Sequence, residues 1–183
     1  MSLLELIDRA DERSLAAAGL ACLDRCLPLL APEGGEALRP VWAAVARGDG
    51  EAWGEAFAKA RVELDAAAAD ADEAAGLVRG MLDAAPVEWA VGPLREWATG
   101  CSVTALALHG RYDAAEVTDE SIARCRAGDG AGAGPLLAGE LRRQETVLDS
   151  VAHGPTGLRR ARELSTEGGR VLRAVVSRRA RTA

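Results

Sequence analysis

The sequence has few aromatic residues, few histidines and almost no lysine. Only 3% of its 183 residues are aromatic, and Lys59 is the single lysine among 22 basic residues. Alanine, in contrast, makes up about a fifth of the chain, and this composition favours helices because strands draw on aromatic and β-branched side chains. We therefore expect an all-α fold, and we attach no functional meaning to the shortage of lysine.

Long hydrophobic runs are also missing. No stretch approaches the roughly eighteen apolar residues of a membrane span, and the N-terminal residues lack the basic region and apolar core of a secretion signal. The chain is long enough for one substantial core and short for two. We expect a cytoplasmic single-domain antiparallel helical bundle of about seven to nine helices over residues 1–183.

Capping residues, prolines and apolar spacing indicate where the helices begin. The expected starts are near Ser2, Arg13, Leu38, Glu51, Leu77, Leu94, Thr118, Pro135 and Thr156. A break is expected near Asp70 and a bend at Gly168 and Gly169. The glycine-rich residues 128–134 are expected to form a flexible loop, and residues 178–183 a disordered basic tail.

The helix expected from Arg13 to Leu30 carries a stripe of apolar residues at three- and four-residue steps. Its members are Leu15, Gly19, Cys22, Leu23, Cys26, Leu27 and Leu30, and the side chains that fall away from the stripe are Arg13, Asp24 and Arg25. Two cysteines one turn apart could begin a zinc site, completed by Cys101, Cys125, His109 or His153. We favour reduced thiols packed in the core, with no bound metal.

Catalytic signals are weak. His109 and His153 each lie near the end of an expected helix, where a cationic imidazole can bond terminal carbonyls. The glycines of residues 128–134 lack the preceding strand and the following Gly-Lys-Ser/Thr of a phosphate loop, although Pro135 begins a helix with an anion-friendly N-terminus. The sequence indicates no catalytic residues, no cofactor and a protein that is not an enzyme.

The C-terminal segment is strongly basic. From Thr156 it contains eight arginines and two glutamates, a net charge of +6, so the rest of the chain carries −12 of the total of −6. One interpretation is a solvated helix face. The alternative is nucleic-acid binding, because clustered arginines gain from phosphate contacts and counterion release; the residues assigned to it are Arg170, Arg173, Arg178, Arg179 and Arg181.

A second surface is a candidate for binding protein. Trp42, Trp53 and Trp97 fit apolar helix faces, whereas Trp89 follows Pro86 in a loop-like region and is expected to be exposed. Residues 65–73 are rich in alanine and acid, and could steer a basic partner towards them. The residues assigned to this partner-binding surface are Trp89, Asp65, Asp70, Asp72 and Glu73.

Three segments carry a resemblance to a known family. They read LAAAGLACLDRCLPLL from Leu15, CSVTALALHG from Cys101 followed after six residues by VTDESIARCR from Val117, and GELRRQETVLDSV from Gly139. Together they resemble the YjaG-like family, bacterial all-helical proteins of unknown biochemical role. The sequence departs from that family where Leu29 and Leu30 replace an aromatic pair, and in its basic C-terminal segment.

A weaker similarity links the alanine-rich helix that ends in Arg25-Cys26-Leu27-Pro28 to the helical immunity proteins of bacterial polymorphic toxin systems. Neither resemblance implies catalytic residues. The sequence therefore predicts a protein–protein interaction module that is not bound to a membrane, with a toxin as partner if the immunity similarity is real. The sequence also leaves open the formation of a homo-oligomer.

Overall fold

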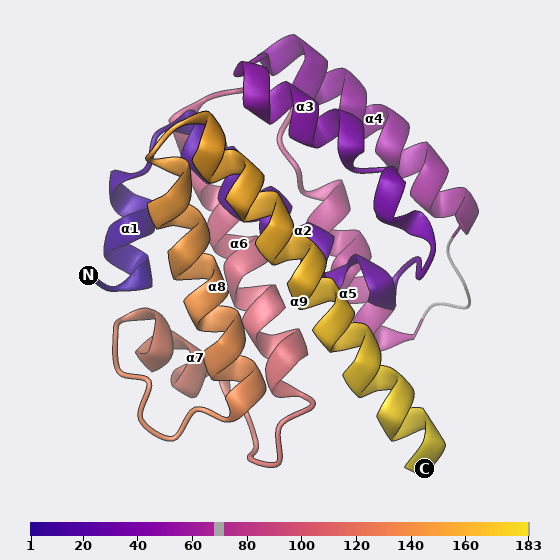
Figure 1. Cartoon of the computed structure of the whole chain (residues 1–183), viewed down its shortest axis with the longest axis vertical. Helices are drawn as coiled ribbons and strands as arrows, with labels where there is room; N and C mark the ends of the chain where they lie inside the picture. The colour runs from indigo at the N-terminus through magenta and orange to yellow at the C-terminus, as the bar shows by residue number, and fades with distance from the viewer. Residues whose placement is uncertain (68–71, 183) are drawn as a thin grey trace.

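The computed structural model describes residues 1–67 and 72–182, and within them every regular element is helical (Figure 1). The α-helices are α1 Leu3–Arg9, α2 Glu12–Cys26, α3 Arg39–Arg47, α4 Gly50–Ala67, α5 Glu73–Asp83, α6 Val91–Gly110, α7 Asp119–Arg126, α8 Pro135–Val151 and α9 Pro155–Thr182. Short 3₁₀ turns lie at Leu27–Leu29 and Gly34–Glu36. The expected all-α fold is confirmed. No helix in the described part of the chain combines the length and apolar character of a membrane span.

Helix α2 is the centre of the bundle. It packs against α6, α8 and α9, which run beside it, and also against α3 and α5 (Figure 1). Nearly every residue from Ser14 to Cys26 is buried, because most side chains in this segment are small or apolar on all sides of the helix. Gly19 permits a close approach to α6, since a Cβ at this position would lie 2.5 Å from the Trp97 ring of that helix.

Four of the six aromatic side chains form one cluster. Trp53, Phe57, Trp89 and Trp97 meet edge to face, with ring centroids 4.6–5.6 Å apart. The indole of Trp53 donates to the carbonyl of Pro86 at 2.7 Å. The Trp97 indole likewise donates to Met81 at 2.9 Å. The scarce aromatic residues thus join α4, α5, α6 and the loop before α6.

Helix ends follow the capping signals of the sequence. Ser2 and Glu5 form the expected capping box of α1, and Thr118 caps α7. The N-terminus of α8 is capped from a distance by Asp113, whose carboxylate accepts from the amides of Leu136 and Leu137 at 2.9 Å each. The anion-friendly terminus behind the glycine-rich loop is therefore filled by the chain's own carboxylate.

Several expectations from the sequence are wrong in detail. The helix from Arg13 ends at Cys26 and continues only as a 3₁₀ turn. Residues 178–182 belong to helix α9 rather than to a disordered tail. Helix α9 also continues through Gly168 and Gly169, and the bend expected there stays a prediction. Its length follows from burial of Gly168, Gly169 and Leu172 against neighbouring helices. The break expected near Asp70 falls outside the described residues.

Candidate functional site

The interior contains an ion pair between Arg25 of α2 and Glu140 of α8. The Arg25 Nε lies 2.8 Å from Glu140 Oε2, and Arg25 Nη2 lies 2.7 Å from Oε1. Both side chains have zero exposure. The expectation that Arg25 falls away from the buried stripe is therefore wrong, because α2 is enclosed on almost every side. A two-pronged contact of this kind fixes both position and orientation.

Three further polar side chains surround the pair. Gln144 donates to Glu140 Oε1 at 2.9 Å, and Ser102 donates to the Gln144 side-chain oxygen at 2.6 Å. His109 Nδ1 lies 2.8 Å from the carbonyl of Ala105. Because a carbonyl only accepts, Nδ1 carries the proton, and His109 Nε2 faces Glu140 Oε2 at 3.6 Å. We call Arg25, Ser102, His109, Glu140 and Gln144 the buried network.

Charge states in the buried network follow from burial and from the ion pair. Burial acts to raise the pKa of Glu140, but Arg25 and the other neighbours outweigh it and hold the pKa below its ordinary value. Burial lowers the pKa of His109 by more than Glu140 raises it. His109 is therefore neutral near pH 7, and the cationic role expected for this histidine is wrong.

The buried network is closed off from solvent. Its five side chains are all buried, and none of them lines either of the two cavities described below. Gly168 of α9 makes room for Arg25, since a Cβ at this position would lie 2.4 Å from Arg25 Cδ. A carboxylate beside an imidazole is a pairing used in acid–base chemistry. Here Glu140 and His109 lie in the buried contact between α2, α6 and α8, where they fix how these helices pack and face no surface that a ligand can reach.

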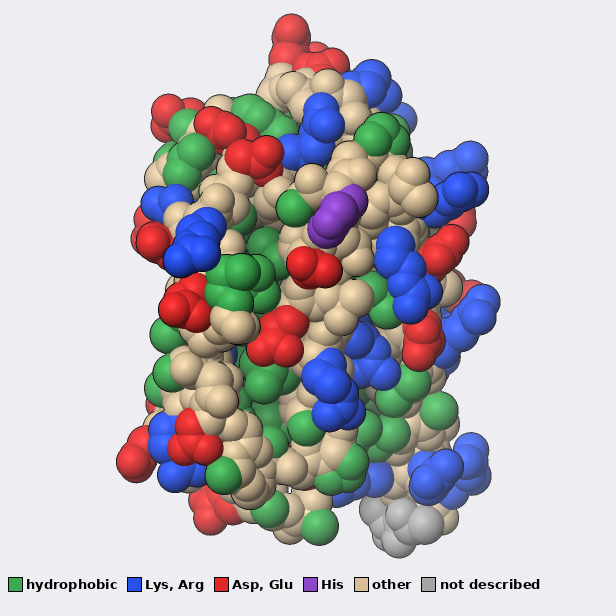
Figure 2. Space-filling view, turned by 60° about the vertical axis from the view of Figure 1, so that its left-hand side comes forward, with side chains coloured by type: hydrophobic (Ala, Val, Ile, Leu, Met, Phe, Trp, Pro, Cys, Tyr) green, Lys and Arg blue, Asp and Glu red, His purple; other side chains and the backbone are tan. Residues whose placement is uncertain are grey.

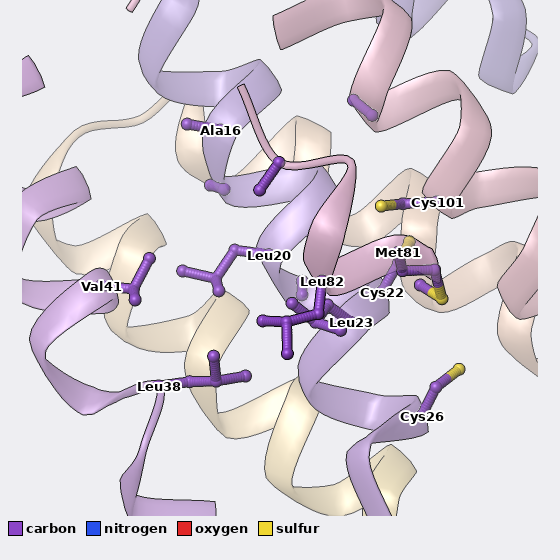
Figure 3. Close-up of a cluster of buried hydrophobic side chains, with 14 of the residues drawn as sticks. Ala16, Leu20, Cys22, Leu23, Cys26, Leu38, Val41, Met81, Leu82 and Cys101 are labelled. Carbon is purple, nitrogen blue, oxygen red and sulfur yellow. The ribbon is translucent and has the colours of Figure 1, made fainter. Parts of the chain in front are cut away.

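The cysteines are core thiols. Cys22, Cys26 and Cys101 point into the packed interior among leucines and Met81 (Figure 3). Burial raises the pKa of the Cys22 thiol to about 12, and it raises the pKa of Cys26 and Cys101 as well. They are protonated near neutral pH. Across residues 1–67 and 72–182, no group of three or more His, Cys, Asp or Glu side chains is placed to hold a metal ion.

A second buried arginine contrasts with Arg25. Arg126, the last residue of α7, has only 8% exposure. Its Nε and Nη2 atoms are buried without a hydrogen-bond partner, and no ion pair to it occurs among the described residues. Burial lowers the pKa of this guanidinium.

The described acidic residues of the first candidate surface have partners within the chain. Asp65 pairs with Arg79, and Glu73 pairs with Arg111 at 2.7 Å. Asp72 caps α5 by accepting from the amide of Ala75. The fourth acidic member, Asp70, lies outside the described residues. Arginines of the chain itself thus neutralise much of the negative charge on the described part of this surface, which weakens its electrostatic attraction for a basic partner.

Two other candidate residues are tied to neighbouring parts of the chain. Trp89 is half-buried rather than exposed, because its ring packs edge to face on Trp53 at 5.3 Å. Its side chain also lies against Gly50, where a Cβ would come within 2.7 Å. His153 is exposed just beyond α8, with Nδ1 2.7 Å from the Asp149 carbonyl, as its expected terminal role requires.

The exposed side of α9 carries a row of arginines. Arg159, Arg162, Arg170, Arg173 and Arg181 are separated by three and eight residues, which places them on one helix face. All five are exposed, and we call this row the arginine face. Lys and Arg side chains gather down the right-hand margin of the surface in Figure 2, with a few acidic side chains among them.

The arginines named from the sequence do not all lie in this row. Arg170, Arg173 and Arg181 belong to the arginine face. Arg179 lies to the side, where it donates to the Tyr112 carbonyl at 2.8 Å and stacks over the Tyr112 ring. Arg178 also has an interaction within the chain. The structure thus places three members of the set on the arginine face and two beside it.

A groove of about 280 Å³ opens beside the arginine face, and we call it the α9 groove. Arg162, Arg170 and Arg173 line one wall, while Asp24, Glu36 and Trp42 lie opposite. The Trp42 indole donates to Asp24 Oδ2 at 2.9 Å, and Arg173 donates to the Pro32 carbonyl at 2.9 Å. Burial raises the pKa of Asp24 by more than Trp42 and nearby arginines lower it.

A larger hollow of about 600 Å³ lies between α5 and α6. Small residues shape it, among them Gly76, Gly80 and Gly100, and its wall includes Trp97 and Cys101. This surface is mainly apolar. It has the shape of a binding site without the converging polar groups that select a ligand.

Sequence reasoning missed both the buried network and the α9 groove. The partners Arg25 and Glu140 are 115 positions apart, and nothing in the sequence pairs them. The available signal was Arg25 itself, a charged residue near the end of a segment, residues 14–26, whose other members are mostly small or apolar. The comparisons with known proteins add no relative: no family profile, curated protein or solved structure matches the chain.

Proposed function

We propose that the protein acts by binding rather than by catalysis, and that the arginine face of α9 is its contact surface for an acidic segment of a partner protein. The observation that carries this proposal is the row itself, five exposed guanidiniums on one side of a 28-residue helix, bordered by a groove. Guanidinium groups match carboxylates in geometry and charge, and they are enriched in protein interfaces.

The arginine face is a better candidate than the acidic residues around Asp65 to Glu73. The described carboxylates there are already engaged with Arg79, Arg111 or a helix N-terminus. On the arginine face, Arg159, Arg162 and Arg170 have no ion pair among the described residues. If the immunity similarity holds, the proposal makes an acidic patch of the toxin the surface that is recognised.

A protein partner fits this surface better than nucleic acid. Asp24 and Glu36 line the α9 groove together with the arginines, and they would repel a nucleic acid, whose phosphates are closely and regularly spaced, whereas a peptide can place its carboxylates away from them. The whole chain is acidic, with a net charge of −6, and the long-range repulsion that this causes is stronger for a densely charged nucleic acid than for a short acidic segment. The Trp42 ring has 4% exposure and is not open for base stacking.

Charge reversal tests the proposal. Binding of a labelled acidic peptide of Glu and Gly is measured by fluorescence anisotropy for the wild type, for Arg162→Glu with Arg170→Glu, and for Arg9→Glu with Arg124→Glu. The control pair changes the net charge equally but lies on α1 and α7. We expect the α9 variant to lose affinity by about tenfold or more and the control to keep its affinity within about threefold.

Equal losses in the two variants would contradict the proposal, because net charge alone would then account for binding. Tighter binding of duplex DNA than of the peptide, with a steep salt dependence that the α9 variant flattens, would favour nucleic acid instead. Charge reversal is preferable to truncation after Glu167, because truncation would also remove the buried Leu172.

A further inference from the structure

Asp24 is the least expected side chain of the α9 groove. It lies between two fully buried residues of α2, Leu23 and Arg25, and its carboxylate reaches the groove. Trp42 supplies its one hydrogen bond, to Oδ2, and no ion pair of the described chain includes it. The groove therefore contains a carboxylate with one oxygen committed and the other without a protein donor.

The charges around this carboxylate restrict what can enter. Arg162, Arg170 and Arg173 would repel a ligand that is only cationic, whereas Asp24 and Glu36 would repel one that is only anionic. A ligand with carboxylates around a single cation complements both walls. The arginines would pair with the carboxylates of such a ligand, and Asp24 would pair with its cation.

The geometry also selects the kind of cation. A guanidinium pairs best with both oxygens of a carboxylate, but the Trp42 indole already uses one of the two acceptor sites of Asp24 Oδ2. A primary ammonium is a compact charge with three donors and can use Oδ1 alone. The groove, at about 280 Å³, lies just below the usual range of ligand pockets, roughly 300–1,000 Å³, so it accommodates one side chain or a terminal residue.

We propose that the α9 groove recognises a primary ammonium within the acidic partner segment, with Asp24 receiving the ammonium while Arg162, Arg170 and Arg173 hold the flanking carboxylates. The ammonium comes from a lysine side chain or from the amino terminus of the segment. This inference rests on the function proposed above and specifies the chemistry of the partner.

Four synthetic peptides of equal acidic composition test the inference. Three are N-acetylated and carry lysine, norleucine or arginine at the centre; the fourth carries norleucine and a free amino terminus. We expect the wild type to bind the lysine or the free-amine peptide about tenfold more tightly than the acetylated norleucine peptide. The arginine peptide should bind more tightly than the acetylated norleucine peptide by clearly less than this factor. The tighter of the two ammonium peptides identifies the source of the group.

Two variants connect that preference to Asp24. Asp24→Asn keeps an oxygen that accepts from Trp42 but removes the negative charge. We expect this variant to bind all four peptides with the same affinity, close to that of the wild type for the acetylated norleucine peptide. Glu36→Gln changes an exposed carboxylate of the same groove and should keep the preference. Circular dichroism checks that both variants are folded.

Equal binding of the lysine, free-amine and acetylated norleucine peptides by the wild type would overturn the inference and leave the proposed function standing. A preference that survives Asp24→Asn, or one that is lost equally in Glu36→Gln, would also overturn it. Failure of the wild type to bind any of the peptides would refute the proposed function together with this inference. The wild-type comparison decides the matter even if Asp24→Asn does not fold.

Discussion

The two buried arginines, Arg25 and Arg126, differ in what surrounds them. Arg25 meets the Glu140 carboxylate with two nitrogens inside the α2, α6 and α8 packing. Arg126, at the end of α7, has buried nitrogen atoms with no partner. Burial of a guanidinium is costly in both places, and only at Arg25 does a carboxylate offset the cost. The difference predicts opposite effects of substitution.

Loss of the Glu140 charge should have the largest effect. Glu140→Gln leaves the positive charge of Arg25 buried without its counterion, and we expect the free energy of unfolding to fall by about 3–5 kcal/mol. Urea denaturation followed by circular dichroism measures it. Asp149→Asn, an exposed change on the same helix, should have almost no effect.

A double substitution separates charge from shape. Arg25→Met with Glu140→Leu replaces the pair with apolar side chains, and it should recover most of the stability that Glu140→Gln loses. If the double variant is as unstable as the single one, the pair would contribute through shape and packing rather than through compensation of charge.

Gly168→Ala should have the next largest effect. The added Cβ would lie 2.4 Å from Arg25 Cδ, and pushing Arg25 aside should cost about 1–3 kcal/mol of stability. The matched control is Gly169→Ala, whose Cβ makes only ordinary contacts at 3.7 Å. The control should be neutral or slightly stabilising, because alanine favours helix. Thermal unfolding measures the stability of both variants. If Gly169→Ala unfolded at a lower temperature than Gly168→Ala, the close contact assigned to Gly168 would be wrong.

Arg126→Met should have a small effect of the opposite sign. Removal of a buried guanidinium that has no counterion should leave the free energy of unfolding unchanged or raise it by about 1 kcal/mol. Chemical denaturation provides the measurement. A loss of more than about 1 kcal/mol would show that Arg126 has a stabilising partner and would remove the contrast with Arg25.

The last effect depends on pH. Because burial lowers the pKa of folded His109, the unfolded chain binds more protons as pH falls through the ordinary value of 6.5, and stability falls with it. The slope for one proton is at most about 1.4 kcal/mol per pH unit. His109→Gln should flatten the profile between pH 7 and 5, whereas the exposed control His153→Gln should not. An unchanged profile in His109→Gln would show that His109 is charged in the folded protein.

The helices could be predicted because their signals are local. The Ser2–Glu5 capping box, the Thr118 cap and the proline that begins α8 each act within a few residues of the chain. The end of α9 could not be predicted in this way. Its arginines resemble a solvated tail, yet Leu172 packs inside the bundle, and Arg173 and Arg179 bond to loops far along the sequence.

The candidate site depended on which helices become neighbours, and the sequence does not encode that in any short pattern. The acid on one wall of the α9 groove comes from α2 and the arginines from α9, so neither segment alone indicates a groove. The arginine row itself could have been recognised from its three- and eight-residue spacing. The Asp24 side chain could not, because its exposure depends on the position of Trp42.

The sequence distance between Arg25 and Glu140 has a consequence for synthesis in the cell. Helix α2 leaves the ribosome before α8, and its buried arginine has no counterion until 115 more residues have been made. At about 5–20 residues per second, that interval lasts roughly 6–23 seconds. During this time the central helix cannot complete its packing, so a nascent chain stalled before Glu140 should remain open to proteases and chaperones.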